Sequence, residues 1–344
     1  MIPEKLFEQA REKILAASKP LIFFDEDGDG LASYALIKKH YDKGIGVALR
    51  TNNDNNIYLR KIEEHRPDLV ITLDKPAISQ ELVDQIKQPM IVIDHHPPNE
   101  LQGVININPR LYDKEDTRPT THWAYHLIEE DINLAWIAAT GIVYDYFLPD
   151  PTFLKTFPYP QLFGTATTLE EARYEQPIGT LVNVFLFILK GSITEQKKYL
   201  DYFMKINDPY DILEQKTPEG KKLWQKYYQH QQQYEAALHH ALQHPPEKNY
   251  YFLKLPKMET SYTSPLSNEL IYRLNVPYVI IAREKEDYMV FSFRSKKGYK
   301  ILPYLEKALK ETPGATGGGH DQACGAYVPK EHYENFIKKV LEQL

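Results

Sequence analysis

Short apolar runs in the first hundred residues each end abruptly in an acidic residue. Residues 20–24, Leu69–Leu73 and Met90–Ile93 are continuous apolar runs rich in β-branched or aromatic side chains, which predicts strands buried on both faces. Residues 31–41 and 80–86 carry apolar positions at helical spacing. Strands that alternate with helices form a parallel sheet, and right-handed crossovers bring their carboxyl ends to one edge. The acids that follow these runs should therefore meet.

The acidic positions after the strands are candidates for a cation site. The first strand runs into Asp25-Glu26-Asp27-Gly28-Asp29-Gly30, the second ends at Asp74, and the third ends at Asp94-His95-His96. Asp25, Asp27 and Asp29 can converge if the chain leaves the strand in an extended form. An EF-hand loop is excluded, because its twelfth position needs a glutamate and holds Leu36. Carboxylates with imidazoles suit Zn, Mn or Fe, although an isolated Asp-His-His is equally compatible with a turn cap beside two surface histidines.

A further acid, Asp145, interrupts an apolar segment at residues 134–147 that predicts a helix. Its neighbours Ile137, Ile142 and Val143 are apolar, so we expect Asp145 to face inward as a metal ligand. The alternative is a solvent-facing residue near the end of the helix.

The second half of the chain predicts a separate domain. A surface excursion at 149–165 and a helix at 169–189 precede a long polar helix at 220–242. Strands are expected at 250–255, 279–282 and 288–293, and helices at 266–274 and 300–309. We therefore predict an α/β protein with a Rossmann-like, parallel-sheet catalytic domain at 1–190, a helical linker at 191–246, a smaller α/β domain at 247–344, and an active site in the cleft between the two domains.

Three consecutive glycines in the predicted second domain indicate an anion site. Gly317, Gly318 and Gly319 leave their backbone N–H groups accessible and are followed by His320. A helix beginning within residues 322–326 would add positive potential. Arg294 ends a strand-like alternation and offers a cationic partner for the same anion. The alternative is a flexible glycine loop.

Composition excludes several other classes. The 344 residues carry a formal net charge of −6, which argues against a generally basic protein that coats nucleic acid. A polar loop is expected at 51–56. No apolar run in the sequence approaches the ~20 residues of a membrane span. The first residues lack the apolar core of a signal peptide. One cysteine, Cys324, allows no intrachain disulfide. We therefore expect a cytoplasmic protein with no membrane partner.

With these motifs in place, the chain resembles the DHH phosphoesterase family, in the branch with a DHH-associated carboxyl-terminal domain. The resemblance covers nearly the whole chain. It rests on four motifs in order, Asp25 to Gly30, Asp74, Asp94-His95-His96 and Asp145, followed by the Gly317-Gly318-Gly319-His320 motif. RecJ-like exonucleases and nano-RNases share this two-domain plan.

The resemblance implies two Mn²⁺ ions, with Mg²⁺ as the alternative. One ion would take Asp27 with Asp25, the other would take Asp29, His95 and Asp145, and Asp74 would bridge them. The resemblance further implies that His96 faces the scissile phosphate, that Asp94 orients the imidazoles, and that Arg294, His320 and the glycine amides hold a substrate phosphate. The chain departs from the family at Phe23 and Asp25, where many members have a histidine, at Lys75-Pro76, and at Cys324.

The predicted function is a Mn²⁺-dependent phosphodiesterase that releases nucleoside monophosphates from single-stranded RNA or DNA, or from short oligonucleotides. One alternative is hydrolysis of a small nucleotide, such as a cyclic dinucleotide or a phosphorylated adenosine monophosphate (pAp). Another is a Cdc45-like scaffold that binds nucleic acid without cleaving it, which the retained acids and histidines disfavour. An inorganic pyrophosphatase is less favoured, because that branch carries a different second domain. A homo-oligomer is compatible with the sequence.

Overall fold

The computed structural model describes residues 2–50, 55–76, 78–256 and 261–344. The chain divides into two compact units, Met1–Tyr227 and Tyr228–Leu344, each built around one five-stranded sheet. The predicted α/β class, with a parallel sheet in the first part and a smaller sheet domain in the second, is confirmed. Most of the polar loop expected at 51–56 lies outside the described residues. The domain limits at 190 and 246 stay predictions.

All strands of the first sheet are parallel, in the order β2-β1-β3-β4-β5. Their bounds are β1 (Pro20–Asp25), β2 (Ile45–Leu49), β3 (Leu69–Leu73), β4 (Met90–Ile93) and β5 (Ile105–Ile107). From β1 the chain crosses first to β2 on one side and then to β3 on the other. The carboxyl ends of β1 and β3 therefore flank a topological switch point, where open α/β sheets bind their ligands.

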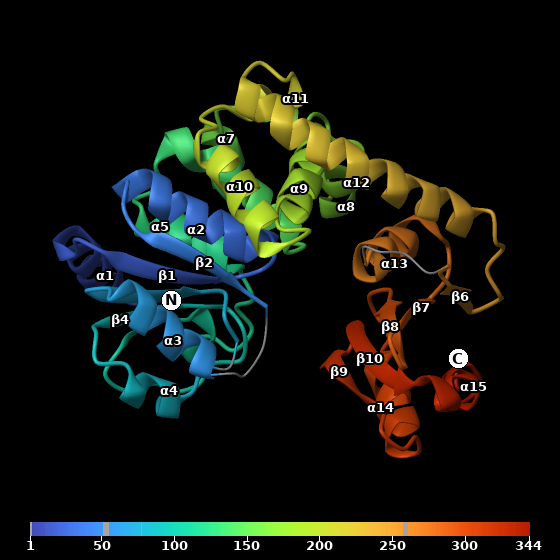
Figure 1. Ribbon diagram of the computed structural model, residues 1–344. Helices are drawn as coiled ribbons and strands as arrows, with labels where there is room; N and C mark the ends of the chain where they lie inside the picture. The colour runs from blue at the N-terminus through green and yellow to red at the C-terminus, as the bar shows by residue number, and fades with distance from the viewer. Residues whose placement is uncertain (1, 51–54, 77, 257–260) are drawn as a thin grey trace. The chain divides into compact units, whose positions relative to one another are not determined.

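Alternating side chains of these strands bury themselves against helices on both faces. Leu21, Phe23 and Val70 pack under α3 and α4, whereas Ile22, Phe24 and Ile71 pack under α1, α2, α5 and α6. Figure 1 shows α3 and α4 on one side of β1, and α2 and α5 on the other. The helices are α1 (Glu4–Ala16), α2 (Gly28–Tyr41), α3 (Asn55–His65), α4 (Gln80–Gln85), α5 (Thr120–Leu127) and α6 (Ala135–Tyr144).

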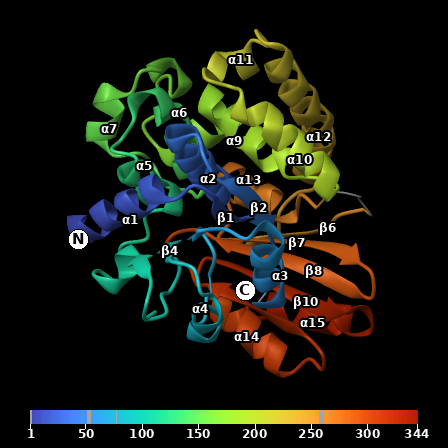
Figure 2. The same ribbon diagram turned by 60° about the vertical axis from the view of Figure 1, so that its left-hand side comes forward.

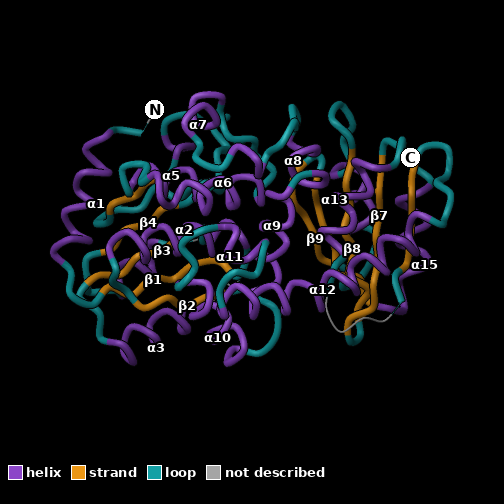
Figure 3. Tube along the Cα trace, turned by 90° about the horizontal axis from the view of Figure 1, so that it is seen from above, coloured by secondary structure: helices purple, strands orange, loops and turns teal. Residues whose placement is uncertain are grey.

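A group of helices completes the first unit, and two sequence expectations fail there. The segment 149–165 is not a plain surface excursion, because Phe157, Leu162 and Phe163 are buried in the main core. The helix expected at 169–189 is broken before Pro177, which has no N–H to continue it. The helices are α7 (Pro151–Thr156), α8 (Leu169–Glu175), α9 (Pro177–Ile188), α10 (Ile193–Met204), α11 (Pro209–Leu213) and α12 (Pro218–Leu242), which continues into the second unit (Figure 3).

The second unit has a mixed sheet in the order β6-β7-β8-β10-β9. Its strands are β6 (Tyr250–Lys254), β7 (Tyr278–Lys285), β8 (Tyr288–Ser295), β9 (Thr316–His320) and β10 (Ala323–Pro329), and its helices are α13 (Thr263–Arg273), α14 (Leu302–Lys310) and α15 (Tyr333–Leu341). Phe291, Phe293 and Phe336 belong to the core that α14 and α15 form on one face. On the opposite face, the Ser267 hydroxyl of α13 lies 2.8 Å from that of Ser292. In Figure 2, α14 and α15 lie below strands β8 and β10, and α13 lies above them.

Candidate active site

The acidic residues of the first unit gather at the switch point of its sheet. Asp25 ends β1, Asp27 and Asp29 lie at the start of α2, and Asp74 and Asp94 directly follow β3 and β4. Parallel pairing aligns Phe24 with Leu73, and Leu73 with Ile93, so these strand ends lie side by side. The predicted meeting of the strand-end acids is therefore present in the structure.

Asp29 is a fully buried carboxylate that serves two helices. It lies in the first turn of α2, so the chain does not leave β1 in the extended form that we expected through Asp29. Its oxygens accept the backbone N–H groups of Thr120 (2.9 Å) and Thr121 (2.7 Å), and also the Thr121 hydroxyl. Asp29 therefore caps the amino terminus of α5, where a negative charge is favourable.

Asp27 occupies the N-cap of α2, and two glycines make room for this turn. The Asp27 carboxylate accepts the Gly30 N–H at 2.9 Å. A side chain at Gly30 would place its Cβ 2.5 Å from the Asp25 carbonyl oxygen, and one at Gly28 would enter the Tyr144 ring. Burial, followed by the charges of Asp25 and Asp29, raises the pKa of Asp27 to about 7. A cation beside Asp27 would offset these penalties.

His95 lies at the centre of the carboxylates. Its Nε2 atom is 3.5 Å from Asp74 Oδ1, 3.7 Å from Asp145 Oδ2 and 3.9 Å from Asp29 Oδ2. These separations exceed a hydrogen bond, but they suit atoms that share one cation, because two ligands each about 2.1 Å from an ion are at most about 4.2 Å apart.

The environment of His95 favours its neutral form. Burial lowers the pKa of His95 despite the nearby charge of Asp29. Its Nδ1 lies 3.4 Å from the Thr117 carbonyl oxygen. With the proton on Nδ1, the imidazole turns the lone pair of Nε2 toward the acids, as a metal ligand requires.

Asp74 and Asp145 are short of positive charge. Burial, together with the neighbouring carboxylates Asp29 and Asp27, raises the pKa of both residues well above its usual range. Asp74 accepts the Thr120 hydroxyl at 3.1 Å. Asp145 is the C-cap of α6 and is not inside the helix as we expected, and 33% of its side chain remains exposed. Clustered carboxylates in this state are a strong attractor for divalent cations.

His96 is held by a small hydrogen-bonded group. Its Nδ1 lies 2.9 Å from Asp94 Oδ1, and its backbone N–H donates to Asp94 Oδ2. Asn108 donates to the His96 carbonyl oxygen at 3.0 Å. Burial opposes the charged imidazole, but the hydrogen bond and charge of Asp94 outweigh it and raise the pKa of His96. Asp94 thus orients His96, which leaves its Nε2 edge for a substrate.

The described residues contain two sets of three possible metal ligands, and within each set the three ligand atoms lie within 4.8 Å of one another. One set is Asp74, His95 and His96, and the other is Asp29, His95 and Asp145. The donor set of imidazoles and carboxylates fits Mn²⁺ or a similar ion. Asp25 belongs to neither set. Its carboxylate instead receives the Lys75 ammonium at 2.6 Å.

The glycine motif of the second unit forms a β-hairpin. Gly317, Gly318 and Gly319 lie in β9, opposite Ala326, Gly325 and Cys324 of β10. The helix expected within 322–326 is therefore wrong, because these residues continue into strand β10. Side chains at Gly317 or Gly319 would approach the β10 backbone to 2.5 Å, which explains the two glycines. Strand β9, His320 included, is exposed, so donors there are accessible to a ligand, whereas β10 is mostly buried or half-buried.

Arg294 and the hairpin share a pocket with a volume of about 550 Å³. The Arg294 guanidinium donates to Ser264 Oγ at 2.7 Å and to Asn268, which fix its direction. Gly317 and Gly318 line the same pocket, whereas His320 is not among its lining residues. The predicted pairing of Arg294 with the glycines is thus present, and His320 lies outside that pocket.

The pocket also contains residues that our sequence analysis missed. Arg283 and Tyr327 both line the pocket, and both are cross-strand neighbours of Val290. The Arg283 Nε atom is buried without a hydrogen-bond partner among the described residues. The alternation of side chains along β8 offered a signal for this face of the sheet. Val290 and Arg294 lie on the same face of β8, about 13 Å apart at ~3.3 Å per residue.

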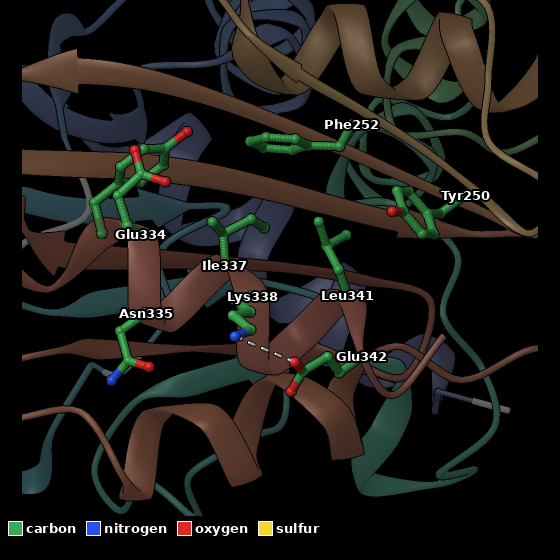
Figure 4. A pocket seen from close by; sticks show the side chains of 9 residues that line it. Tyr250, Phe252, Glu334, Asn335, Ile337, Lys338, Leu341 and Glu342 are labelled. Carbon is green, nitrogen blue, oxygen red and sulfur yellow. Dashed lines mark ion pairs between the residues drawn. The ribbon is translucent and has the colours of Figure 1, made fainter.

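A second hollow of the same unit lies beside the edge strand β6. Tyr250, Phe252, Ile337 and Leu341 give it an apolar lining (Figure 4), and its volume is about 640 Å³. A Lys338–Glu342 ion pair of 3.8 Å lies at its border. This groove contains none of the predicted site residues.

Comparison with known families agrees with this arrangement. The family description "DHH family, N-terminal domain" matches residues 19–147, and "DHHA1 domain" matches residues 247–344. The chain belongs to the DHH family. The predicted family and its associated carboxyl-terminal domain are thus confirmed, and the first match spans the acids and both histidines of the candidate site.

Solved structures show the same DHH-family fold. RecJ from Thermus thermophilus in complex with Mn²⁺ superposes with a TM-score of 0.73 at 15% identity, covering 98% of this chain and 53% of the RecJ chain. This DHH-family chain therefore spans about half the length of that RecJ. An exonuclease RecJ bound to manganese gives 0.66 at 16% identity, covering 98% and 94%. A pGpG-specific phosphodiesterase from Vibrio cholerae gives 0.51 at 14% identity, covering 95% and 98%.

A search of curated proteins gave no match to this DHH-family chain. Within the described residues, none of the helices combines the length and the apolar character needed to cross a membrane.

Proposed function

We propose that this DHH-family protein is a Mn²⁺-dependent phosphodiesterase that releases nucleoside monophosphates from single-stranded nucleic acid, with short oligonucleotides as its preferred substrates. The observation that carries the proposal is the position of His95 Nε2, between 3.5 and 3.9 Å from three carboxylates, none of which pairs with a lysine or arginine of the described chain. Mg²⁺ is the alternative cation. We further propose a cytoplasmic location, since the single Cys324 is a free thiol.

Each residue of the first unit has a defined task in this proposal. Asp27, Asp29, Asp74, His95 and Asp145 would hold two cations. When bound, such ions lower the pKa of a water molecule and neutralise charge on the phosphate. His96, oriented by Asp94, donates a hydrogen bond to the phosphate, for which its raised pKa is suited.

The second unit holds the substrate in this proposal. The hairpin amides, His320 and Arg294 bind a phosphate, and residues 1–190 and 247–344 act as the catalytic and the substrate-holding domain. Arg283 offers a further cationic group. It lies opposite Val290, which is about 13 Å along β8 from Arg294, so only a substrate longer than one nucleotide reaches both arginines. The pocket volume and the net charge of −6 favour short substrates over long strands.

A small-nucleotide phosphodiesterase is the second candidate, because a pocket near 550 Å³ also accommodates a cyclic or linear dinucleotide. The deciding experiment compares end-labelled 2-mer, 5-mer and 30-mer RNA and DNA, together with a cyclic dinucleotide, in the presence of Mn²⁺. We expect stepwise release of monophosphates and the highest kcat/KM for the 2-mer and 5-mer. Hydrolysis confined to the cyclic dinucleotide and the 2-mer, with the 5-mer and 30-mer left intact, would favour the second candidate, and binding without hydrolysis of any substrate would favour a scaffold.

A further inference from the structure

Lys75 is a buried cation directly beside the candidate metal site. Its side chain is almost fully buried, with 3% of the residue exposed. The ammonium donates to Asp25 Oδ1 at 2.6 Å and to the Leu49 carbonyl oxygen at 2.9 Å. A lysine in such a position needs these partners, because a buried ammonium without them would be strongly disfavoured.

The backbone at Asp74 explains why Lys75 points to Asp25. Asp74 has a φ of +56°, in the left-handed region that side-chain-bearing residues seldom adopt. This turn sends the Asp74 carboxylate toward Thr120 and His95, while the next side chain reaches across β1 to Asp25 and to the end of β2. Asp74 thus points into the acid cluster, while the adjacent Lys75 binds Asp25 at the edge of that cluster.

The Lys75 ammonium and a metal ion compete for the same carboxylate. An ion about 2.1 Å from an Asp25 oxygen would lie within a few ångströms of the ammonium, and like charges at that distance repel. Neither set of clustered ligand atoms includes Asp25 or Asp27, but of these two only Asp25 receives a lysine ammonium in the described part of the chain. The ammonium also supplies the positive charge that Asp25 would otherwise take from a metal.

We propose that Lys75 acts as a built-in cation that neutralises Asp25 and withdraws it from metal binding. The divalent ions are then held by Asp27, Asp29, Asp74, His95 and Asp145, and Asp25 is a positioning residue that holds Lys75 at the border of the site. This inference rests on the proposed binding of Mn²⁺ by the acid cluster. It assigns Asp25 a different role from the one that the family resemblance implies.

The proposal is tested by counting metal ions with calorimetry on the full chain, titrated with Mn²⁺ alone. Asp25→Asn should bind the same number of Mn²⁺ ions as the parent, with a Kd changed by less than about threefold, because the carboxylate is not a ligand. Lys75→Met should bind one additional Mn²⁺, or bind the same number at least about tenfold more tightly, because Asp25 is released. The double variant Asp25→Asn/Lys75→Met should return to the parental number and affinity.

Two further variants serve as controls. Asp74→Asn, which alters a proposed ligand, should lose an ion or bind at least about tenfold more weakly. Lys190→Met removes a half-buried lysine, which lies near the charges of Glu26 and Asp27. It should change Mn²⁺ affinity less than Lys75→Met does, and equally with and without Asp25→Asn.

Different results would overturn different claims. Loss of an ion in Asp25→Asn, or unchanged number and affinity in Lys75→Met, overturns the role of Lys75 and leaves the proposed function standing. A parent protein that binds no Mn²⁺ overturns the proposed function and this inference with it. If Lys75→Met fails to fold because Asp25 loses its charged partner, or Asp25→Asn fails because the buried Lys75 loses its carboxylate, the double variant, which keeps neither charge, decides the question: loss of an ion in it would show that Asp25 is a metal ligand.

Discussion

The two candidate sites of this protein are opposites in burial and charge. In the first unit, Asp29, Asp74 and Asp94 are buried carboxylates whose positions are fixed by hydrogen bonds from the protein itself. In the second unit, the glycine strand β9 is exposed and offers N–H groups and a cationic neighbour, Arg294. The buried carboxylates of the first site favour binding of cations, whereas the exposed hydrogen-bond donors of the second site favour binding of an anion. The contrast suggests chemistry in one unit and substrate holding in the other.

Removal of divalent cations should give the largest effect, because only the first site depends on them. Dialysis against EDTA should abolish hydrolysis of a 5-mer, and Mn²⁺ should restore it better than Ca²⁺, whose larger oxygen-rich shell suits imidazole poorly. Fluorescence anisotropy in EDTA should still detect binding of the oligonucleotide by the second unit. Full hydrolysis in excess chelator would remove the proposed difference between the two sites.

Asp74→Asn should lower the rate by about 10³-fold, the scale of losing a principal catalytic group. Asparagine tolerates the left-handed backbone at this position and keeps an oxygen for the Thr120 hydroxyl, so the fold should persist in circular dichroism. The matched control is Asp84→Asn, an exposed aspartate of α4. Retention of most of the activity in Asp74→Asn would show that the strand-end acids do not share a cation.

His320→Ala should slow oligonucleotide cleavage by about 10- to 100-fold, the value of a hydrogen bond to a charged group, while the number of bound Mn²⁺ ions stays the same. A small activated phosphodiester has little to hold at the hairpin and should suffer less. His332→Ala removes a histidine of the same unit as a control. A lost metal ion, or equal losses on both substrates, would argue against the division of tasks.

Arg283→Gln should have the smallest effect, about two- to fivefold in KM for a 5-mer, as expected of a partly solvated ion contact. The effect should shrink for a 2-mer, which reaches Arg283 less well, and kcat should not change. Lys307→Gln, an exposed lysine on α14, is the control. An identical loss for both lengths would place Arg283 outside the substrate path.

Strand ends were predictable from the sequence because they combine two strong local signals. An apolar run followed at once by an acid marks both the strand and its ligand, as at Leu73–Asp74 and Ile93–Asp94. The hairpin of β9 and β10 escaped this logic, because Gly317 to Gly319 have no side chains with which to show a period of two. Asp145 was placed inside a helix, because its apolar neighbours hide the point at which α6 ends.

Contacts between distant segments were not predictable from local patterns. The Lys75–Asp25 pair depends on the register of β1 and β3 and on the positive φ of Asp74. Likewise, Thr120 and Thr121 support Asp29 across more than 90 residues of sequence. The spacing of residues in the sequence does not predict such partners, because only the tertiary structure brings them together.

The bonds of Asp29 bear on how an inactive form of this protein should be made. Its carboxylate closes the first turn of α5 from the inside of the core, so a substitution there removes a helix cap as well as a proposed ligand. A variant intended to trap an uncleaved substrate for crystallography is better altered at His96, whose side chain is one-third exposed and hydrogen-bonds to Asp94. Poor yield of an Asp29 variant would report on folding, and would say little about catalysis.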